Sequence, residues 1–128
     1  MSERFDELVS IMDRLRGEGG CPWDREQSFE DVLGHIRGEL DEVVEAVRSE
    51  DGAHVEEELG DLLFTVVFAV RLGRERGWLS MDSVLAGICE KLIRRHPHIF
   101  GDEPRQDLTA EQVLEQWERI KAEEKRGR

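Results

Sequence analysis

The chain has 128 residues, of which 38% are charged, and its net charge at neutral pH is −12. This length predicts a single domain, residues 1–128, with its own apolar core. The acidic balance argues against nucleic acid or an anionic membrane as a partner, and no apolar run is long enough to span a bilayer. Cys21 and Cys89 stand far apart, outside any C-x-x-C pattern, and are expected to be free thiols of a cytoplasmic protein.

Apolar residues recur every three or four positions along most of the chain, which predicts helices and no strand. The first helix is expected at residues 3–16, and a glycine-rich loop at residues 17–24 follows it. Ser28, with Asp31 three positions later, is expected to cap the second helix. That helix extends to a turn at residues 49–52.

The third helix, at residues 53–76, is apolar on nearly every side from position 59 to position 72. This pattern predicts that it is the central, buried helix of the protein. A fourth helix is expected to begin at residue 80 or 82 and to end at Pro97, and Thr109 is expected to cap the last one. The predicted fold is therefore all-α and bundle-like, with four main helices plus a short one.

The most acidic part of the chain contains two pairs of carboxylates. Glu39 and Glu42 are three positions apart on the second helix, and Glu58 and Asp61 have the same spacing on the third, so each pair shares a helix face. The short turn between the two helices predicts antiparallel packing that brings the pairs together. Four hard oxygen ligands in one groove suit Mg²⁺ or Mn²⁺.

Asp61 strengthens this interpretation because it lies inside the apolar run, where an ionised carboxylate is costly unless it is paired or bound to a metal. A salt bridge from Asp61 to Arg71 or Arg95 would explain it equally well. Glu39 with Glu42 also fits a solvated helix face, where acidic pairs at this spacing are common. Spacing and expected burial therefore leave both the metal site and these alternatives open.

Five motifs follow one another along almost the whole chain. They are Gly20-Cys21-Pro22-Trp23-Asp24 with Gln27, Glu39-x-x-Glu42, Glu57-Glu58-Leu59-Gly60-Asp61-Leu62-Leu63, Glu90-Lys91-Leu92-Ile93-Arg94-Arg95-His96-Pro97-His98-Ile99-Phe100-Gly101 and Trp117-Glu118-x-Ile120-Lys121-x-x-Glu124-Lys125. Together they resemble the MazG nucleotide pyrophosphohydrolases. The resemblance implies an all-α NTP pyrophosphatase fold that assembles as a homodimer or homotetramer. It implies hydrolysis of NTPs or dNTPs to a monophosphate and pyrophosphate, for cleansing or regulation of the nucleotide pool.

The resemblance also implies roles for particular side chains. The four carboxylates would hold magnesium and act in catalysis, while Lys91 and Arg95, one helical turn apart, would contact the phosphates. Trp117 and Lys121 would complete the nucleotide site. Trp23 is assigned from its position rather than from the resemblance: it lies in the glycine-rich loop, where a core role explains it less easily, and it is expected to close over the base. Two of these assignments have simpler alternatives, because Lys91 and Arg95 also fit charges that complement a helix C-terminus, and Trp117 also fits a core anchor.

One position departs from the family pattern. MazG proteins commonly begin the first acidic motif with two adjacent glutamates, and here the first position is Gly38. The four expected ligands remain, so the change puts in doubt a supporting role of the missing carboxylate or its contribution to an extra metal.

Three rival functions remain at this point. The chain could be a narrower relative, such as an all-α dUTPase or a phosphoribosyl-ATP pyrophosphohydrolase. A di-iron carboxylate protein is less favoured, because that class uses E-x-x-H pairs and the partners here are Glu42 and Asp61. The last rival is a non-enzymatic acidic helical protein that acts through its surface.

Overall fold

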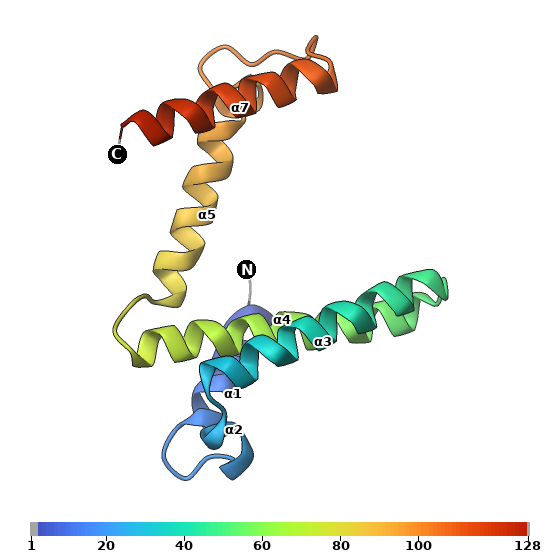
Figure 1. Ribbon diagram of the computed structural model, residues 1–128, viewed down its shortest axis with the longest axis vertical. Helices are drawn as coiled ribbons and strands as arrows, with labels where there is room; N and C mark the ends of the chain where they lie inside the picture. The colour runs from blue at the N-terminus through green and yellow to red at the C-terminus, as the bar shows by residue number, and fades with distance from the viewer. Residues whose placement is uncertain (1–2, 128) are drawn as a thin grey trace. The chain divides into compact units, whose positions relative to one another are not determined.

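The computed structural model describes residues 3–127, and this part consists of helices and connecting loops without a β-strand (Figure 1). The all-α prediction is confirmed. No helix of the described part is long and apolar enough to cross a membrane.

The contacts divide the chain into two compact units, Met1–Met81 and Asp82–Arg128. The helices are α1 Glu3–Arg16, α2 Pro22–Glu26, α3 Phe29–Arg48, α4 Gly52–Glu75, α5 Met81–Arg95, α6 Pro97–Phe100 and α7 Ala110–Arg126.

Two helices begin with the capping boxes that the sequence predicts. Ser28 Oγ accepts a hydrogen bond from the Asp31 amide at 3.1 Å, and the Ser28 amide donates to Asp31 Oδ2 at 2.9 Å. Thr109 and Gln112 make the same reciprocal pair at the start of α7. Each box satisfies two backbone groups that a helix start leaves unpaired, so it fixes where the helix begins.

The structure adds two short helices that the sequence interpretation lacks. Residues 17–24 are not a continuous loop, because α2 begins at Pro22. In the same way, Pro97 follows the end of α5 and opens α6. Proline suits the first helical turn, where its missing N–H has no partner to lose. The last helix, α7, has 17 residues.

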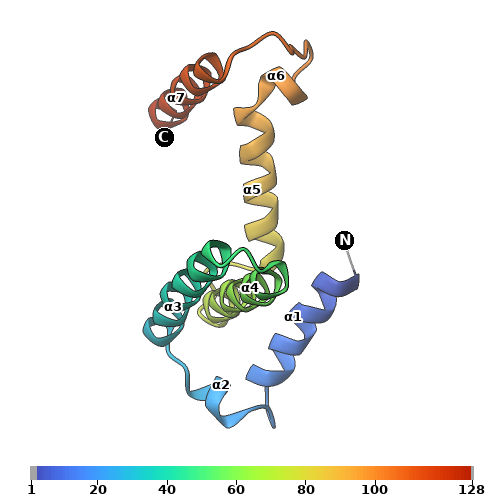
Figure 2. The same ribbon diagram turned by 90° about the vertical axis from the view of Figure 1, so that its right-hand side faces the viewer.

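In the first unit, α3 and α4 form an antiparallel hairpin, and they lie side by side in both views (Figures 1 and 2). Asp51 caps α4 by accepting hydrogen bonds from the Ala53 and His54 amides, and Glu50 in the turn has a left-handed φ of 57°. Helix α1 packs on α4. The core between these helices consists of Met12, Val32, Val67, Phe68 and Leu72.

Helix α4 is buried on one side only, which corrects the expectation of a helix enclosed all round. Thr65, Val67 and Phe68 face the core, whereas Leu59 and Leu63 keep 49% and 46% of their surface exposed. Asp61 is also exposed. Within this chain α1 and α3 cover only part of the α4 surface, so an apolar sequence on every side does not by itself bury every side.

The second unit contains α5, α6 and α7, and none of their described residues is fully buried. Polar contacts join its helices: Arg95 on α5 pairs with Glu124 on α7, and Gln116 on α7 contacts Nδ1 of His98 on α6 at 2.9 Å. The apolar side chains of α5, including Ile88 and Leu92, remain close to half exposed.

Candidate functional site

Three of the four predicted carboxylates come together across the α3–α4 hairpin. One oxygen each from Glu39 on α3 and from Glu58 and Asp61 on α4 lie within 4.8 Å of one another. The Glu58 side chain is 13% exposed, Glu39 is half-buried, and Asp61 is open to solvent. The cluster is therefore sheltered on one side and accessible on the other.

The electrostatics of Glu39 show that this arrangement is unfavourable without a counter-charge. Burial raises the pKa of its carboxyl, and the charges of Asp61 and Glu58 raise it further. Its Oε2 atom is buried and has no hydrogen-bond partner among the described residues. A buried carboxylate oxygen normally has a partner, and repelling oxygens this close favour protonation or a bound cation. The donor set thus fits a hard divalent ion, which prefers carboxylate oxygens.

Glu42 lies outside this group of three. It is exposed on α3, one turn beyond Glu39, although its charge is among the smaller contributions that raise the pKa of Glu39. The sequence interpretation also missed a neighbour, because His54 Nε2 lies 3.4 Å from Glu58 Oε1. The i,i+4 spacing of His54 and Glu58 on one helix is the signal that could have found this contact.

Within the first unit, the alternative of a salt bridge from Asp61 to Arg71 does not match the observed pairs. Arg71 binds Asp13 at 2.7 Å and Glu75 at 3.1 Å. Arg95 binds Glu124 at 2.9 Å.

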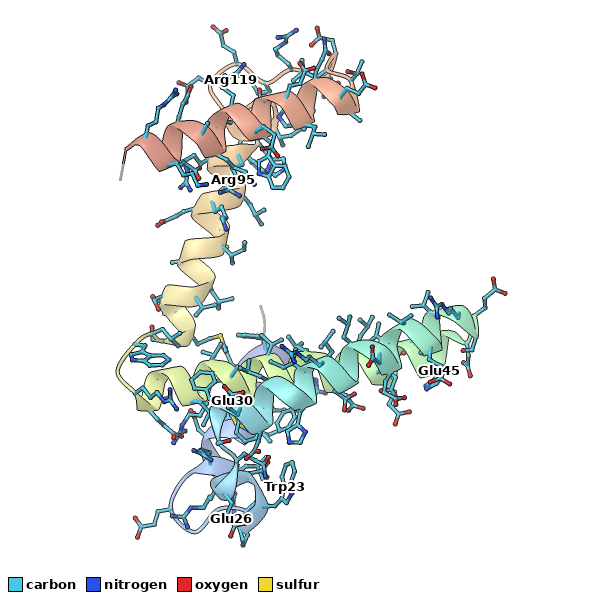
Figure 3. All side chains as sticks on the ribbon, viewed as in Figure 1. Trp23, Glu26, Glu30, Glu45, Arg95 and Arg119 are labelled. Carbon is cyan, nitrogen blue, oxygen red and sulfur yellow. The ribbon has the colours of Figure 1, made fainter. Side chains whose placement is uncertain are left out.

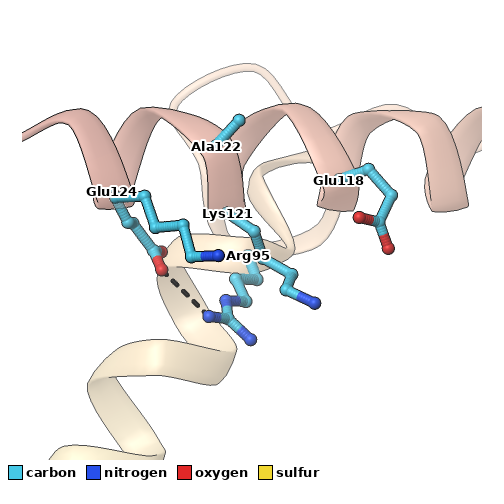
Figure 4. Close-up of a pocket in the computed structure, with 6 residues that line it drawn as sticks. Arg95, Glu118, Lys121, Ala122 and Glu124 are labelled. Carbon is cyan, nitrogen blue, oxygen red and sulfur yellow. Dashed lines mark hydrogen bonds and ion pairs between the residues drawn. The ribbon is translucent and has the colours of Figure 1, made fainter.

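The second unit gathers basic and aromatic side chains between α5 and α7. The Arg95 guanidinium carbon lies 5.8 Å from the centre of the Trp117 ring, and Lys121 Nζ lies 4.9 Å from the same centre. Figure 4 shows Arg95 and Lys121 extending into the same open space beside α7. Three of the predicted substrate-binding residues are therefore neighbours.

Two cavities adjoin these side chains, and Arg95 lines both. One, of about 390 Å³, is charged and includes Lys121, Glu118 and Glu124. The other, of about 500 Å³, is mostly apolar and includes Trp117 and the exposed Lys91. A nucleotide has charged phosphates and a flat, largely apolar base. A charged cavity beside an apolar one therefore suits both parts of such a ligand.

Trp23 belongs to the first unit. It lies on α2 with 55% of its surface exposed, and its ring is 5.4 Å from that of His35 on α3 (Figure 3). An exposed tryptophan next to an imidazole is a flat surface on which a ring could stack. His96 and His98 lie with their rings 5.6 Å apart.

The fold and the carboxylate cluster define an all-α protein whose acidic hairpin is suited to a divalent cation. Comparison with known proteins makes this more specific. The profile of the MazG nucleotide pyrophosphohydrolase domain matches residues 27–100, and the chain belongs to that family. The matched segment includes the carboxylate hairpin together with Lys91 and Arg95.

Curated relatives are similar over nearly the whole chain. The nucleoside triphosphate pyrophosphohydrolase/pyrophosphatase MazG of Thermotoga maritima is 46% identical over 121 residues, which cover 94% of this chain and 45% of the relative. The nucleoside triphosphate pyrophosphohydrolase of Escherichia coli K12 is 43% identical, over 95% of this chain and 46% of the relative. The chain therefore spans about half the length of the curated relatives it matches.

A solved structure supports the fold. The crystal structure of a MazG-related protein from Thermotoga maritima superposes with a TM-score of 0.78 at 28% identity, covering 91% of this chain and 98% of that one.

Proposed function

We propose that this protein hydrolyses nucleoside triphosphates to nucleoside monophosphates and pyrophosphate in the presence of Mg²⁺, which Mn²⁺ can replace. The observation that carries the proposal is the meeting of Glu39, Glu58 and Asp61 within 4.8 Å, together with a buried Glu39 oxygen that has no hydrogen-bond partner in residues 3–127. The proposal is supported by family membership and by the named activity of the relatives. Under it, residues 1–128 act as one MazG-type domain in the cytoplasm, for nucleotide-pool cleansing or regulation.

The three clustered carboxylates, with Glu42 nearby, are assigned to holding the metal. A metal ion held there would neutralise phosphate charge and lower the pKa of a coordinated water. A carboxylate of the cluster would orient the attacking water. Trp23 is assigned to the base.

The basic residues of the second unit are assigned to the phosphates. Lys91, Arg95 and Lys121 bind phosphate oxygens and stabilise the charge that develops on the leaving pyrophosphate. Trp117 provides a flat surface beside the two cations that it contacts.

The test is product analysis over canonical and damaged NTPs and dNTPs with Mg²⁺ or Mn²⁺. Glu39→Gln and Asp61→Ala are each expected to slow pyrophosphate release by about 100-fold or more, equivalent to about 2.7 kcal/mol of transition-state stabilisation. Glu45→Gln, which removes one charge from the exposed part of α3, is the matched control and should retain the parent rate. Parent-like rates in folded Glu39 and Asp61 variants would refute the metal assignment. Strong preference for a single nucleotide would instead favour a narrower enzyme.

We also propose that the chain assembles with a second copy, as a homodimer or homotetramer. The support is an exposed apolar surface on the hairpin, because Leu40 and Val47 on α3 and Leu63 on α4 are 52%, 54% and 46% exposed. Apolar patches of this kind on helical hairpins are usually covered in an oligomer. Light scattering of the parent and of Leu63→Asp, with circular dichroism to check folding, tests this. A monomeric parent would contradict it.

A further inference from the structure

Glu124 on α7 binds two consecutive arginines at the end of α5. Its Oε1 accepts a hydrogen bond from Arg95 Nη2 at 2.9 Å, and its Oε2 accepts one from Arg94 Nε at 2.6 Å (Figure 4 draws the bond to Arg95). The side chains of Arg95 and Glu124 are only 14% and 16% exposed. This pair is therefore sheltered, unlike the surface ion pairs that contribute little.

Glu124 is also ionised at any physiological pH. The hydrogen bonds from Arg95 and Arg94 lower the pKa of its carboxyl to about 2. The carboxylate that accepts the bond from Arg95 therefore stays charged under working conditions.

Arg95 is held on two sides as a result. Glu124 binds Nη2, and the Trp117 ring lies 5.8 Å from the guanidinium carbon. The Nε atom is buried and has no hydrogen-bond partner among the described residues. An arginine binds phosphate through a planar fork whose donors must point correctly, so a restrained guanidinium is ready for that geometry before the ligand arrives.

We propose that Glu124 is a positioning residue, which fixes the Arg95 guanidinium in the orientation that binds the phosphates of the substrate. The proposal rests on the proposed function. It adds to that function a residue that is neither a metal ligand nor a phosphate-binding residue. A carboxylate beside the phosphate site also has a cost, because its charge repels an anion. Glu124 is therefore expected to raise kcat and, at the same time, to weaken the binding of the anionic substrate in its ground state. A contact whose only role was to hold α5 against α7 would not affect kcat and substrate binding in opposite directions.

The experiment compares Glu124→Ala and Glu124→Gln in the full chain, with the neighbouring exposed Glu123→Gln as the matched control. Glu124→Ala is expected to lower kcat by at least 10-fold while KM stays the same or falls. Glu124→Gln should recover part of the loss, because its amide oxygen still accepts a bond from Arg95. Glu123→Gln should match the parent. An unchanged kcat in a folded Glu124→Ala variant, or a loss confined to KM, overturns the proposal.

A double-mutant cycle separates positioning from a general loss of structure. If Glu124 acts through Arg95, adding Glu124→Ala to Arg95→Ala produces no further loss of kcat. Two losses that multiply would mean that Glu124 acts independently, and would overturn the proposal.

A binding measurement keeps this proposal distinct from the proposed function. Calorimetry with inorganic pyrophosphate and Mg²⁺ on the same four proteins of the cycle requires no hydrolysis. If the parent hydrolyses no NTP but the two substitutions are coupled in pyrophosphate affinity, the proposed function fails and the positioning role stands. Additive effects on affinity, or no pyrophosphate binding by the parent, overturn the positioning role.

Discussion

Replacing Glu39 by glutamine should stabilise the metal-free protein and abolish most of its stabilisation by magnesium. The substitution removes one charge from three carboxylates whose oxygens lie within 4.8 Å. At that distance each like-charged pair repels by about 0.9 kcal/mol in a water-like dielectric and by about 3.5 kcal/mol at an effective dielectric of 20. Glu39 takes part in two such pairs. Because Asp61 is exposed, the water-like value is the better guide, and the expected gain is about 1–2 kcal/mol.

Thermal unfolding in EDTA and in excess Mg²⁺ measures both effects. A gain of about 1–2 kcal/mol raises the melting temperature by roughly 3–8 °C for a chain of this size. The parent should gain about 2.7 kcal/mol when free magnesium is 100 times its dissociation constant, and Glu39→Gln should gain little. Glu45→Gln is the control for a charge lost elsewhere on α3. The reasoning is refuted if Glu39→Gln melts below the parent in EDTA or keeps the full response to magnesium.

The same cluster fixes the sign of a pH effect. The folded state raises the pKa of Glu39 above its ordinary 4.5. Its contribution to stability is therefore fully present below pH 4.5 and is lost as the pH rises through the folded value. The metal-free parent should lose stability over this range relative to Glu39→Gln, and parallel pH profiles of the two melting temperatures would contradict this.

Four further changes test the packing. Gly38→Ala should stabilise by about 1 kcal/mol in chemical denaturation, because alanine favours a helix over glycine and the added methyl group meets no described atom beyond its own helix backbone within 4 Å. Gly73→Ala should cost about 1–3 kcal/mol, because its methyl group would lie 2.8 Å from Leu79 Cγ. Arg16→Ala should cost about 2–4 kcal/mol by removing hydrogen bonds to two α2-region carbonyls and to a carboxylate; near-parent stability would contradict this. The Glu124 ion pairs should stabilise fully above pH 4.5 and weaken as the pH falls toward 2, with Glu124→Gln lacking that loss in acid melts.

Local signals predicted the helix positions well. The first helix occupies the predicted residues, and the boxes at Ser28 and Thr109 define the starts of α3 and α7, because capping depends only on side chains within one turn. The short α2 was missed because Pro22 signals either a loop or a helix start, and the neighbouring glycines favoured the loop. The exposure of Asp61 was missed because an apolar sequence does not say which element covers it.

The same division between local signals and contacts between distant residues holds for the candidate site. The meeting of Glu39 with Glu58 and Asp61 could be predicted from helical spacing and a short turn, because both act locally. The exclusion of Glu42 could not, since it depends on how far each helix is rotated about its axis. The contact of Glu124 with Arg95 could not be predicted either, because it joins residues 29 positions apart and no periodic pattern marks it.

The lengths of the helical segments on either side of the α3–α4 turn, rather than the length of the turn itself, fix where the carboxylates meet. Glu39 and Glu58 each lie more than one helical turn away from it, so lengthening the turn leaves packed helices in the same register. A single residue inserted within either helix, between its carboxylate and the turn, would instead rotate that carboxylate by about 100° and move it by about 1.5 Å along the axis. Related chains should therefore vary freely in turn length and be nearly invariant in the lengths of these two helical segments.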